Sequence, residues 1–366
     1  MCSFDDHNSP VPPHNTDGSG ITRRRFLATT AIAAAILPLE STLALAESDQ
    51  STKAGDMQFR TLGRTGEKVS VIGVGGAHIG GEKVSDAEAI RIMRTAIDSG
   101  VNFMDNCWDY HDGRSEMLMG RALQGGYRQK VFLMTKIDGR DAKTAAKQIN
   151  ESLQRLKTDH IDLMQIHEVI RSNDPQRCFE PGGAMEAIIA AKKAGKIRYV
   201  GFTGHKSPDL HLRMIDVARK NKFHFDTMQM PINIFDAHYD SFEKRVLPVA
   251  EKEGIAVLGM KPMGGKFLLE TKTVTPVECL QYALSQTVSV VITGIDSMNI
   301  LKQDLRVARE FQPMGKDAIS ALLQKTAKVA STGKHEKYKT STHFDGTHRH
   351  PEWLGPGGEK GVSPAA

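Results

Sequence analysis

Two hydrophobic periodicities alternate along the chain between about residue 69 and residue 311. Short, nearly continuous apolar runs are typical of buried parallel strands, and each is followed by a longer stretch whose apolar residues recur at helical spacing. The short runs predict strands at 69–76, 101–105, 131–136, 161–167, 197–203, 225–230, 255–260 and 289–294. The longer stretches predict helices at 86–99, 115–123, 142–156, 183–194, 208–219, 239–252, 276–285 and 299–311. Eight strand–helix units in strict alternation favour an α/β fold, a closed (β/α)8 TIM barrel over residues 57–312, over an open doubly wound sheet.

The first 46 residues have the layout of a secretory signal. A polar start is followed by three arginines at 23–25, a weakly apolar run over 26–37 and a small-residue cleavage site at 44–46. The paired arginines resemble a twin-arginine (Tat) signal, which predicts recognition by the Tat export machinery, a periplasmic location and a mature chain that begins at Glu47. The alternative is an arginine-rich start of an amphipathic helix. The apolar run is shorter than the roughly 20 residues of a stable membrane span, and residues 47–56 are predicted to be a linker.

Residues 313–366 do not continue the alternation. They predict one further helix at 316–330, followed by a polar tail. Apolar side chains in that tail fit a segment that folds over the barrel mouth with Trp353 as an apolar lid, and a mobile tail is the alternative. The tail also contains several histidines, but ligand-like spacing in a flexible segment is weak evidence, and we predict no metal site.

The composition is that of a globular protein, with 25% charged and 40% hydrophobic residues and a formal net charge of +5. No block of like charge extends beyond the three arginines, so no nucleic-acid partner is predicted. The four cysteines contain no CxxC pair, which argues against an iron–sulfur centre, a structural zinc and a disulfide framework. The glycines at 73–76 leave the first strand without the GxGxxG spacing of a Rossmann fingerprint.

Four polar side chains mark the ends of three neighbouring predicted strands. Asp105 ends the second strand with Tyr110 five residues later, while Lys136 and His167 end the third and fourth. In a barrel these ends surround one mouth, where active sites form. Reduction of a carbonyl needs a hydride donor at carbon and a proton donor at oxygen. We expect the Lys136 ammonium to lower the pKa of the Tyr110 phenol, and Asp105 to hold Lys136. His167 is expected to hydrogen-bond the substrate oxygen.

Three stretches resemble signatures of the aldo-keto reductase superfamily. They are FMDNCWDY at 103–110, LMGRAL at 118–123 and GKIRYVGFT at 195–203. The resemblance extends from about residue 57 to residue 311. It implies an NAD(P)-dependent enzyme that interconverts a small carbonyl compound and the matching alcohol, with Tyr110 as the general acid/base.

The resemblance also implies where a nicotinamide dinucleotide lies. It implies NADP(H), with NAD(H) as the alternative. The cofactor-binding positions are Gly76, Ala77, Asp105, Thr203, Gly204, Gln229, Met260, Lys261, Pro262, Met263, Gly264, Gly294, Asp296, Ile300 and Asp304.

Departures from the family pattern bear on that cofactor. Gly204 stands where an asparagine is common, which removes one amide contact to the carboxamide. Met260 replaces a stacking aromatic, although a thioether can also cover a ring face. Asp296 and Ile300 stand where basic or polar residues are common, and a carboxylate repels a 2′-phosphate but accepts a bond from a 2′-hydroxyl. These two positions favour NAD locally, against the family's habit of NADP.

Two other classes of function remain as alternatives. One is a non-catalytic or weakly catalytic nicotinamide-binding subunit, or a redox sensor, of a periplasmic complex. The other, a metal-dependent barrel hydrolase, needs clustered histidine and carboxylate ligands at the strand ends. The predicted strands place only one histidine, His167, at such an end, so this class is disfavoured.

Overall fold

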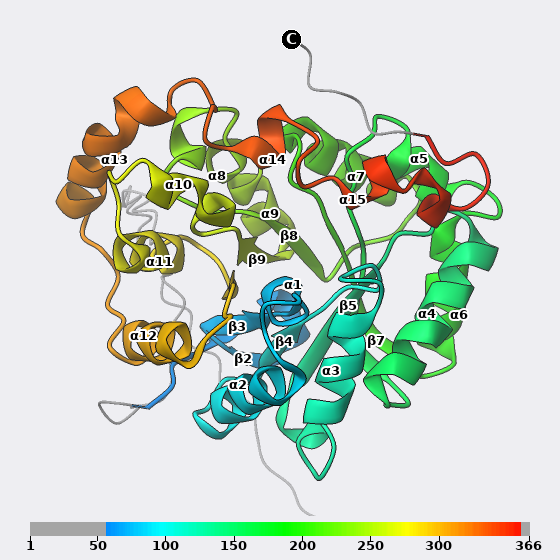
Figure 1. Cartoon of the computed structure of the whole chain (residues 1–366). Coiled ribbons are helices and arrows are strands. Elements are labelled where there is room, and N and C mark those ends of the chain that lie inside the picture. Colours follow the sequence, from blue (N-terminus) through cyan, green and yellow to red (C-terminus); the bar gives the residue numbers. More distant parts are fainter. Residues whose placement is uncertain (1–55, 360–366) are drawn as a thin grey trace, which may run out of the picture. The chain divides into compact units, whose positions relative to one another are not determined.

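A closed barrel of parallel strands forms the centre of the protein (Figure 1). The structure, a computed structural model, describes residues 56–359. The barrel strands are β3 (Ile72–Gly75), β4 (Phe103–Asp105), β5 (Phe132–Ile137), β6 (Ile161–Ile166), β7 (Ile197–Thr203), β8 (Thr227–Pro231), β9 (Ala256–Met260) and β10 (Val290–Thr293). They follow chain order around the barrel, and β10 closes it by pairing parallel to β3. The predicted (β/α)8 TIM barrel is confirmed.

Helices surround the barrel, and local capping sets several of their ends. Those that follow the strands are α2 (Asp86–Asp98), α3 (Arg114–Ala122), α4 (Ala142–Leu156), α6 (Ala184–Lys193), α7 (Pro208–Lys220), α8 (Phe242–Arg245), α9 (Leu247–Glu253), α11 (Pro276–Leu284) and α12 (Met298–Arg309). The Asp141 carboxylate caps α4 by accepting from the Thr144 amide at 2.9 Å. Thr275 and Glu278 form a reciprocal capping box at the start of α11.

A hairpin closes the N-terminal end of the barrel. It consists of β1 (Phe59–Thr61) and β2 (Lys68–Ser70), paired antiparallel. Leu62 and Val69 of the hairpin pack against the buried interior residues Phe103 and Phe132, whose rings are stacked with centroids 5.4 Å apart. The barrel interior is therefore filled with side chains, and only its opposite end is available for chemistry.

Two predicted elements are each divided in the structure. The single strand predicted at 69–76 is divided at Val71 into β2 and β3, because one apolar run serves both the hairpin and the barrel. The helix predicted at 239–252 is divided at Val246 into α8 and α9, and Pro248, which lacks an N–H, lies in the first turn of α9. The short elements that were not predicted include α1 (Gly76–Ile79), α5 (Asp174–Phe179), α10 (Phe267–Glu270), η1 (Gly63–Thr65), η2 (Arg128–Lys130), η3 (Asp236–His238) and η4 (Gly264–Lys266).

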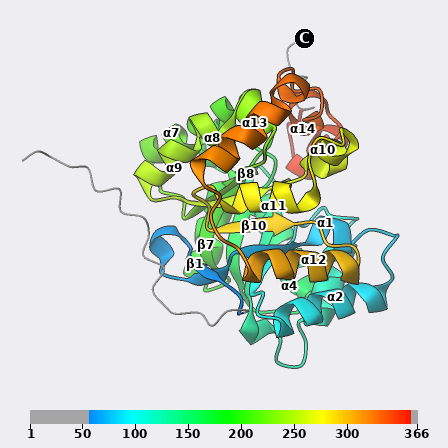
Figure 2. The same ribbon diagram turned by 90° about the vertical axis from the view of Figure 1, so that its left-hand side faces the viewer.

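The C-terminal segment packs on the barrel. α13 (Lys316–Ala330) has the predicted bounds and lies beside α11 (Figure 2). The chain then forms α14 (Lys337–Thr340), α15 (Gly346–Arg349) and η5 (Pro351–Leu354). Of the two alternatives for the tail, the folded one describes it as far as residue 359.

Residues 1–55 and 360–366 lie outside the described residues. The predicted signal segment falls there, as does the predicted linker apart from its last residue. Within residues 56–359, none of the helices combines the length and the apolar character that a bilayer crossing requires.

Candidate active site

The four predicted catalytic side chains lie together at the C-terminal ends of β4, β5 and β6. Lys136 Nζ is 2.5 Å from Asp105 Oδ1 and 3.3 Å from the Tyr110 hydroxyl. The rings of Tyr110 and His167 meet edge to face, with centroids 5.8 Å apart. Asp105, Lys136 and His167 are buried, and Tyr110 is half-buried. The structure thus brings together a phenol, an ammonium, a carboxylate and an imidazole that come from separate loops and strands.

The electrostatics of Tyr110 differ from the expectation. Burial raises the pKa of the Tyr110 phenol well above its ordinary value, and the Asp105 carboxylate raises it further. Lys136 Nζ contacts the Tyr110 hydroxyl but is also paired with Asp105 at 2.5 Å, and the net shift of the pKa of Tyr110 is upward. The net direction of the shift is thus opposite to the lowering that we expected from Lys136 alone. Tyr110 keeps its proton at neutral pH, which suits a proton donor.

His167 is held by three side chains that the sequence did not single out. Its Nδ1 lies 2.9 Å from Asp138 Oδ1, 3.2 Å from Cys107 Sγ and 3.6 Å from Asp109 Oδ1. Burial lowers the pKa of His167, and burial raises the pKa of Asp109 to about 7 and that of Asp138 to about 8. Asp138 was not predicted as a site residue, because it lies beyond the predicted end of its strand.

The predicted carboxamide-binding residues adjoin the catalytic set. Gln229 Nε2 donates to Asp105 Oδ2 at 2.5 Å, whereas the buried Gln229 Oε1 has no partner among the described residues. Thr203 is buried at the end of β7. Gly204 follows it where a Cβ atom would lie 2.7 Å from the Val169 carbonyl oxygen. A buried amide oxygen without a donor is an acceptor available to a ligand.

The loop after β9 brings a cation to the mouth. Met260 ends β9, and Lys261 follows with a φ of 53°. Burial lowers the pKa of Lys261 to about 8, although the Glu168 carboxylate opposes the shift. The Lys261 ammonium lies 4.4 Å from the centroid of the Phe344 ring, which belongs to the tail. The remaining residues predicted in this loop, Pro262, Met263 and Gly264, continue it into η4.

The predicted adenosine end follows β10 and continues into α12. Asp296 is exposed and Ile300 is half-buried, while Asp304 is fully buried with its Oδ2 unpartnered among the described residues. Burial raises the pKa of Asp304 to about 6. His78 covers Gly294, where a Cβ atom would lie 2.4 Å from the imidazole ring. His78 was not predicted, because nothing in its sequence context indicates that α1 points toward β10.

The predicted residues Gly76 and Ala77 fix α1 at the mouth. The Gly76 carbonyl accepts from Ser115 Oγ at 2.8 Å, and the Ala77 carbonyl lies 2.7 Å from His111 Nε2. A Cβ atom at Gly76 would lie 2.7 Å from Ser115 Oγ. The glycine therefore allows α1 to approach the start of α3 closely.

Two buried carboxylates anchor the tail. Glu168 accepts from the backbone amides of Gly346 and Thr347, each at 2.8 Å. Asp345 pairs with His205 Nε2 at 2.9 Å and with Lys206 Nζ at 2.8 Å.

Trp353 packs edge to face on Trp108, with centroids 5.9 Å apart, and its carbonyl accepts from Gln148 Nε2 at 2.9 Å. It therefore contacts the loop that carries Tyr110, as a wall beside the candidate site.

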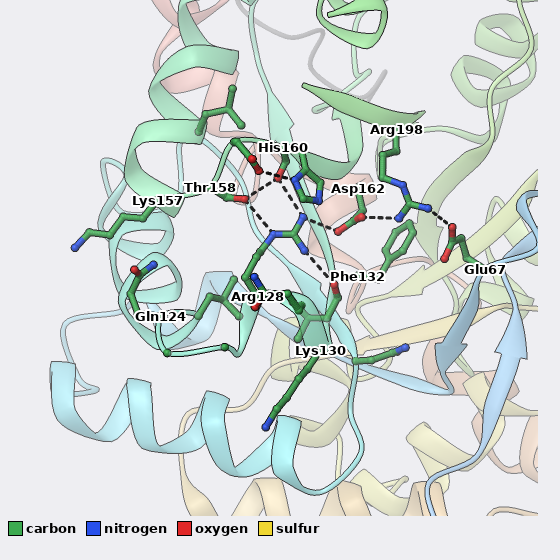
Figure 3. Close-up of a pocket in the computed structure, with 18 of the residues that line it drawn as sticks. Glu67, Gln124, Arg128, Lys130, Phe132, Lys157, Thr158, His160, Asp162 and Arg198 are labelled. Atoms are coloured by element: carbon green, nitrogen blue, oxygen red, sulfur yellow. Dashed lines mark hydrogen bonds and ion pairs between the residues drawn. The ribbon is translucent and has the colours of Figure 1, made fainter. Parts of the chain in front are cut away.

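A surface cavity of about 1040 Å³ lies at the other end of the barrel (Figure 3). There Arg128 donates to Asp162 at 2.8 Å, and Arg198 donates to the second oxygen of the same carboxylate at 2.7 Å. Arg198 also pairs with Glu67. Because these charges satisfy one another next to the starts of β5 and β6, they stabilise the barrel. None of the predicted site residues lines this cavity.

Comparison with known proteins identifies the family to which the chain belongs. The model of the aldo/keto reductase family matches residues 71–278, more than half of the chain. The protein therefore belongs to the aldo/keto reductase family, a family of oxidoreductases.

Individual relatives are distant. The chain is 25% identical over 302 residues to an L-galactose dehydrogenase of Arabidopsis thaliana. The match covers 71% of this chain and 91% of that protein. It is 28% identical over 232 residues to the uncharacterized oxidoreductase YrpG of Bacillus subtilis, with 58% and 68% covered. The holo form of aldo-keto reductase AKR11C1 from Bacillus halodurans superposes with a TM-score of 0.61 at 23% identity, covering 76% of this chain and 99% of that one. This last likeness supports the barrel fold.

Proposed function

We propose that the protein is an NAD(P)-dependent oxidoreductase that interconverts an aldehyde or ketone and the matching alcohol. The observation that carries the proposal is the contact of Lys136 Nζ with both Asp105, at 2.5 Å, and the Tyr110 hydroxyl, at 3.3 Å. A bound nicotinamide would supply or accept the hydride. The intact cluster favours catalysis over a non-catalytic sensor subunit.

Tyr110 is the proposed general acid in reduction and the general base in oxidation. Its O–H donates to the carbonyl oxygen as negative charge develops there, and Lys136 stabilises the phenolate that remains. Asp105 holds the Lys136 ammonium in place. His167, whose burial keeps it neutral, orients the carbonyl through a hydrogen bond.

The residues present fit a nicotinamide dinucleotide. The unpartnered Gln229 Oε1 is positioned to accept from a carboxamide N–H, and Lys261 offers a positive charge for a pyrophosphate. We propose NADP(H), with NAD(H) as the alternative that the exposed carboxylate of Asp296 favours. Titration with NADPH and with NADH, followed by quenching of Trp108 and Trp353, measures both affinities.

The decisive test of catalysis is Tyr110→Phe, with Tyr127→Phe as the matched control because the Tyr127 hydroxyl bonds Asp98 away from the mouth. We expect Tyr110→Phe to lower kcat by about 10³-fold, within the usual range for loss of a general acid, with nucleotide affinity unchanged. Undiminished turnover in Tyr110→Phe would refute the role. A panel of aldehydes, ketones and sugars, L-galactose among them because one relative carries its name, tests the substrate class.

We further propose export through the Tat pathway to the periplasm, which rests on the sequence of residues 22–46 alone. Because that compartment has no evident supply of reduced nicotinamide, the cofactor is loaded before export and stays bound, so that one substrate's oxidation is coupled to another's reduction. Periplasmic protein that contains no nucleotide and exchanges added nucleotide within seconds would contradict this.

A further inference from the structure

Four potential ligand atoms converge behind the imidazole of His167. Cys107 Sγ, Asp109 Oδ1 and His167 Nδ1 meet a carboxylate oxygen of Asp138, and all four lie within 4.8 Å of one another. The residues come from the loop after β4 and from the positions just beyond β5 and β6. The exposed fraction of their side chains is at most 9% for His167 and Asp109, and zero for Asp138. The cluster is thus assembled by separate strands and shielded from solvent.

The protein alone leaves this cluster incompletely satisfied. Asp109 Oδ1 and Asp138 Oδ2 are buried and have no hydrogen-bond partner among residues 56–359. Asp109 Oδ1 faces His167 Nδ1 at 3.6 Å, so it is aimed into the cluster. The neighbouring buried cations are engaged elsewhere, since Arg140 pairs with Asp174 at 2.9 Å. Buried carboxylates are normally paired or bound to metal ions.

We propose that Cys107, Asp109, Asp138 and His167 form a binding site for a divalent transition-metal ion, with zinc as the preferred ion. Thiolate, imidazole and carboxylate are the donors that Zn²⁺ takes in tetrahedral sites. The charge of the ion compensates the carboxylates and deprotonates the thiol. The sequence alone predicted no metal site, because His167 was the only histidine that it placed at a strand end.

The distances from His167 Nδ1 to the other three groups are close to those of a tetrahedral site. Tetrahedral zinc at ordinary bond lengths separates a nitrogen from an oxygen ligand by about 3.4 Å and from a sulfur ligand by about 3.6 Å. In the structure Nδ1 lies 2.9 Å from Asp138 Oδ1, 3.6 Å from Asp109 Oδ1 and 3.2 Å from Cys107 Sγ. These three distances each differ by about 0.5 Å or less from those of a tetrahedral site, and the other three separations among the four atoms are at most 4.8 Å.

Such a site has a consequence for His167. A metal ion on Nδ1 fixes the tautomer with the proton on Nε2. That tautomer donates a hydrogen bond, as the proposed function requires of His167, whereas an ionised Asp138 accepting from Nδ1–H would leave Nε2 without a proton. Metal content is nevertheless measurable without turnover, so the site and the proposed function fail separately.

The test is the zinc content of the purified, folded full-length protein after exposure to Zn²⁺ and dialysis, measured by mass spectrometry. We expect one zinc per chain in the parent and in Cys178→Ser, a control for a second fully buried free thiol. Cys107→Ser and Asp138→Asn should each bind zinc at least about tenfold more weakly, because loss of a ligand costs no less than loss of a residue that only supports one. A folded parent without zinc, or a Cys107→Ser variant with undiminished zinc, would overturn the proposal.

Cobalt substitution supplies a second measurement, which requires no variant of a proposed ligand. Co²⁺ bound to the parent should show a thiolate-to-cobalt charge-transfer band together with the intense visible bands of tetrahedral cobalt. Cys178→Ser should retain that spectrum. A Co²⁺ spectrum without thiolate charge transfer, or one lost in Cys178→Ser, would contradict ligation by Cys107.

Discussion

Replacement of Asp304 by Asn should stabilise the protein at neutral pH. Asp304 is fully buried on α12, its Oδ2 has no partner among the described residues, and burial raises its pKa from 3.8 to about 6. When the pKa of an acid is higher in the folded state than in the unfolded state, ionisation of that acid in the unfolded chain lowers the free energy of unfolding. The penalty is absent below pH 3.8, grows through the interval up to about pH 6, and is constant above it. Asn resembles the protonated carboxyl and avoids the penalty.

The magnitude follows from the shift of about two pKa units at about 1.4 kcal/mol each. The stability gain of Asp304→Asn should be about 3 kcal/mol at pH 7.5 and about 1 kcal/mol at pH 4.5. Urea unfolding of both proteins at the two pH values measures it. Asp317→Asn, at an exposed position on α13, should change stability by about 0.5 kcal/mol or less at either pH.

Equal stability of Asp304→Asn and the parent at pH 7.5 would refute the reasoning, because it would mean that the buried charge is already compensated. The variant also addresses why the charge is kept. If Asp304 contacts the adenosine end of the nucleotide, Asp304→Asn should gain stability and lose nucleotide affinity. That outcome is the familiar exchange of stability for binding.

Three further predictions concern the mouth and the helix packing. Affinity for NADPH should fall by about tenfold or more between pH 7 and pH 9.5, because Lys261 with a pKa of about 8 loses its charge. Lys261→Met should abolish this pH dependence. An unchanged dependence of the affinity on pH in Lys261→Met would contradict the prediction. Gly120→Ala should lower the free energy of unfolding by about 2 kcal/mol, since its Cβ would lie 2.3 Å from the Arg155 carbonyl oxygen. Gly315→Ala is the control, because its Cβ meets open space. Equal urea midpoints for the two variants would refute this prediction. Glu168→Ala should raise amide exchange at residues 346–347 by about 100-fold in hydrogen-exchange mass spectrometry, because two amides lose a charged acceptor, and retained protection would show that other contacts hold the tail.

The barrel could be predicted because parallel strands covered on both faces are apolar throughout. α4 and β7 accordingly have the predicted bounds. In each, both the apolar pattern and the polar residues that flank it are unambiguous in the sequence. The break at Val71 could not be predicted, because residues that fill the barrel end and residues that form the barrel wall have the same character. Hydrophobicity reports burial, and it does not report the direction of the chain.

The site could be predicted in part for the same reason. Asp105, Lys136 and His167 were found because they stand at strand ends or next to them, and the positions of these ends follow from the fold. Tyr110 was found from its place five residues after Asp105. Asp138 and His78 were missed because each is a single polar residue in a loop, and its partner depends on loop conformation. The sign of the net pKa shift of Tyr110 was also missed, since it depends on the burial of the phenol and on the nearby Asp105 carboxylate.

The residues after β6 connect the catalytic cluster with the tail. His167 faces the Cys107 side of the mouth, while the adjacent Glu168 has a φ of 45° and faces the tail. That left-handed conformation costs a non-glycine residue about 1–2 kcal/mol. The bonds that Glu168 accepts from Gly346 and Thr347 offset this cost, because they form only when the carboxylate points to the tail. The tail therefore stabilises the backbone conformation that also directs His167, so its removal should disturb the imidazole even though the tail contributes no group to the catalytic set.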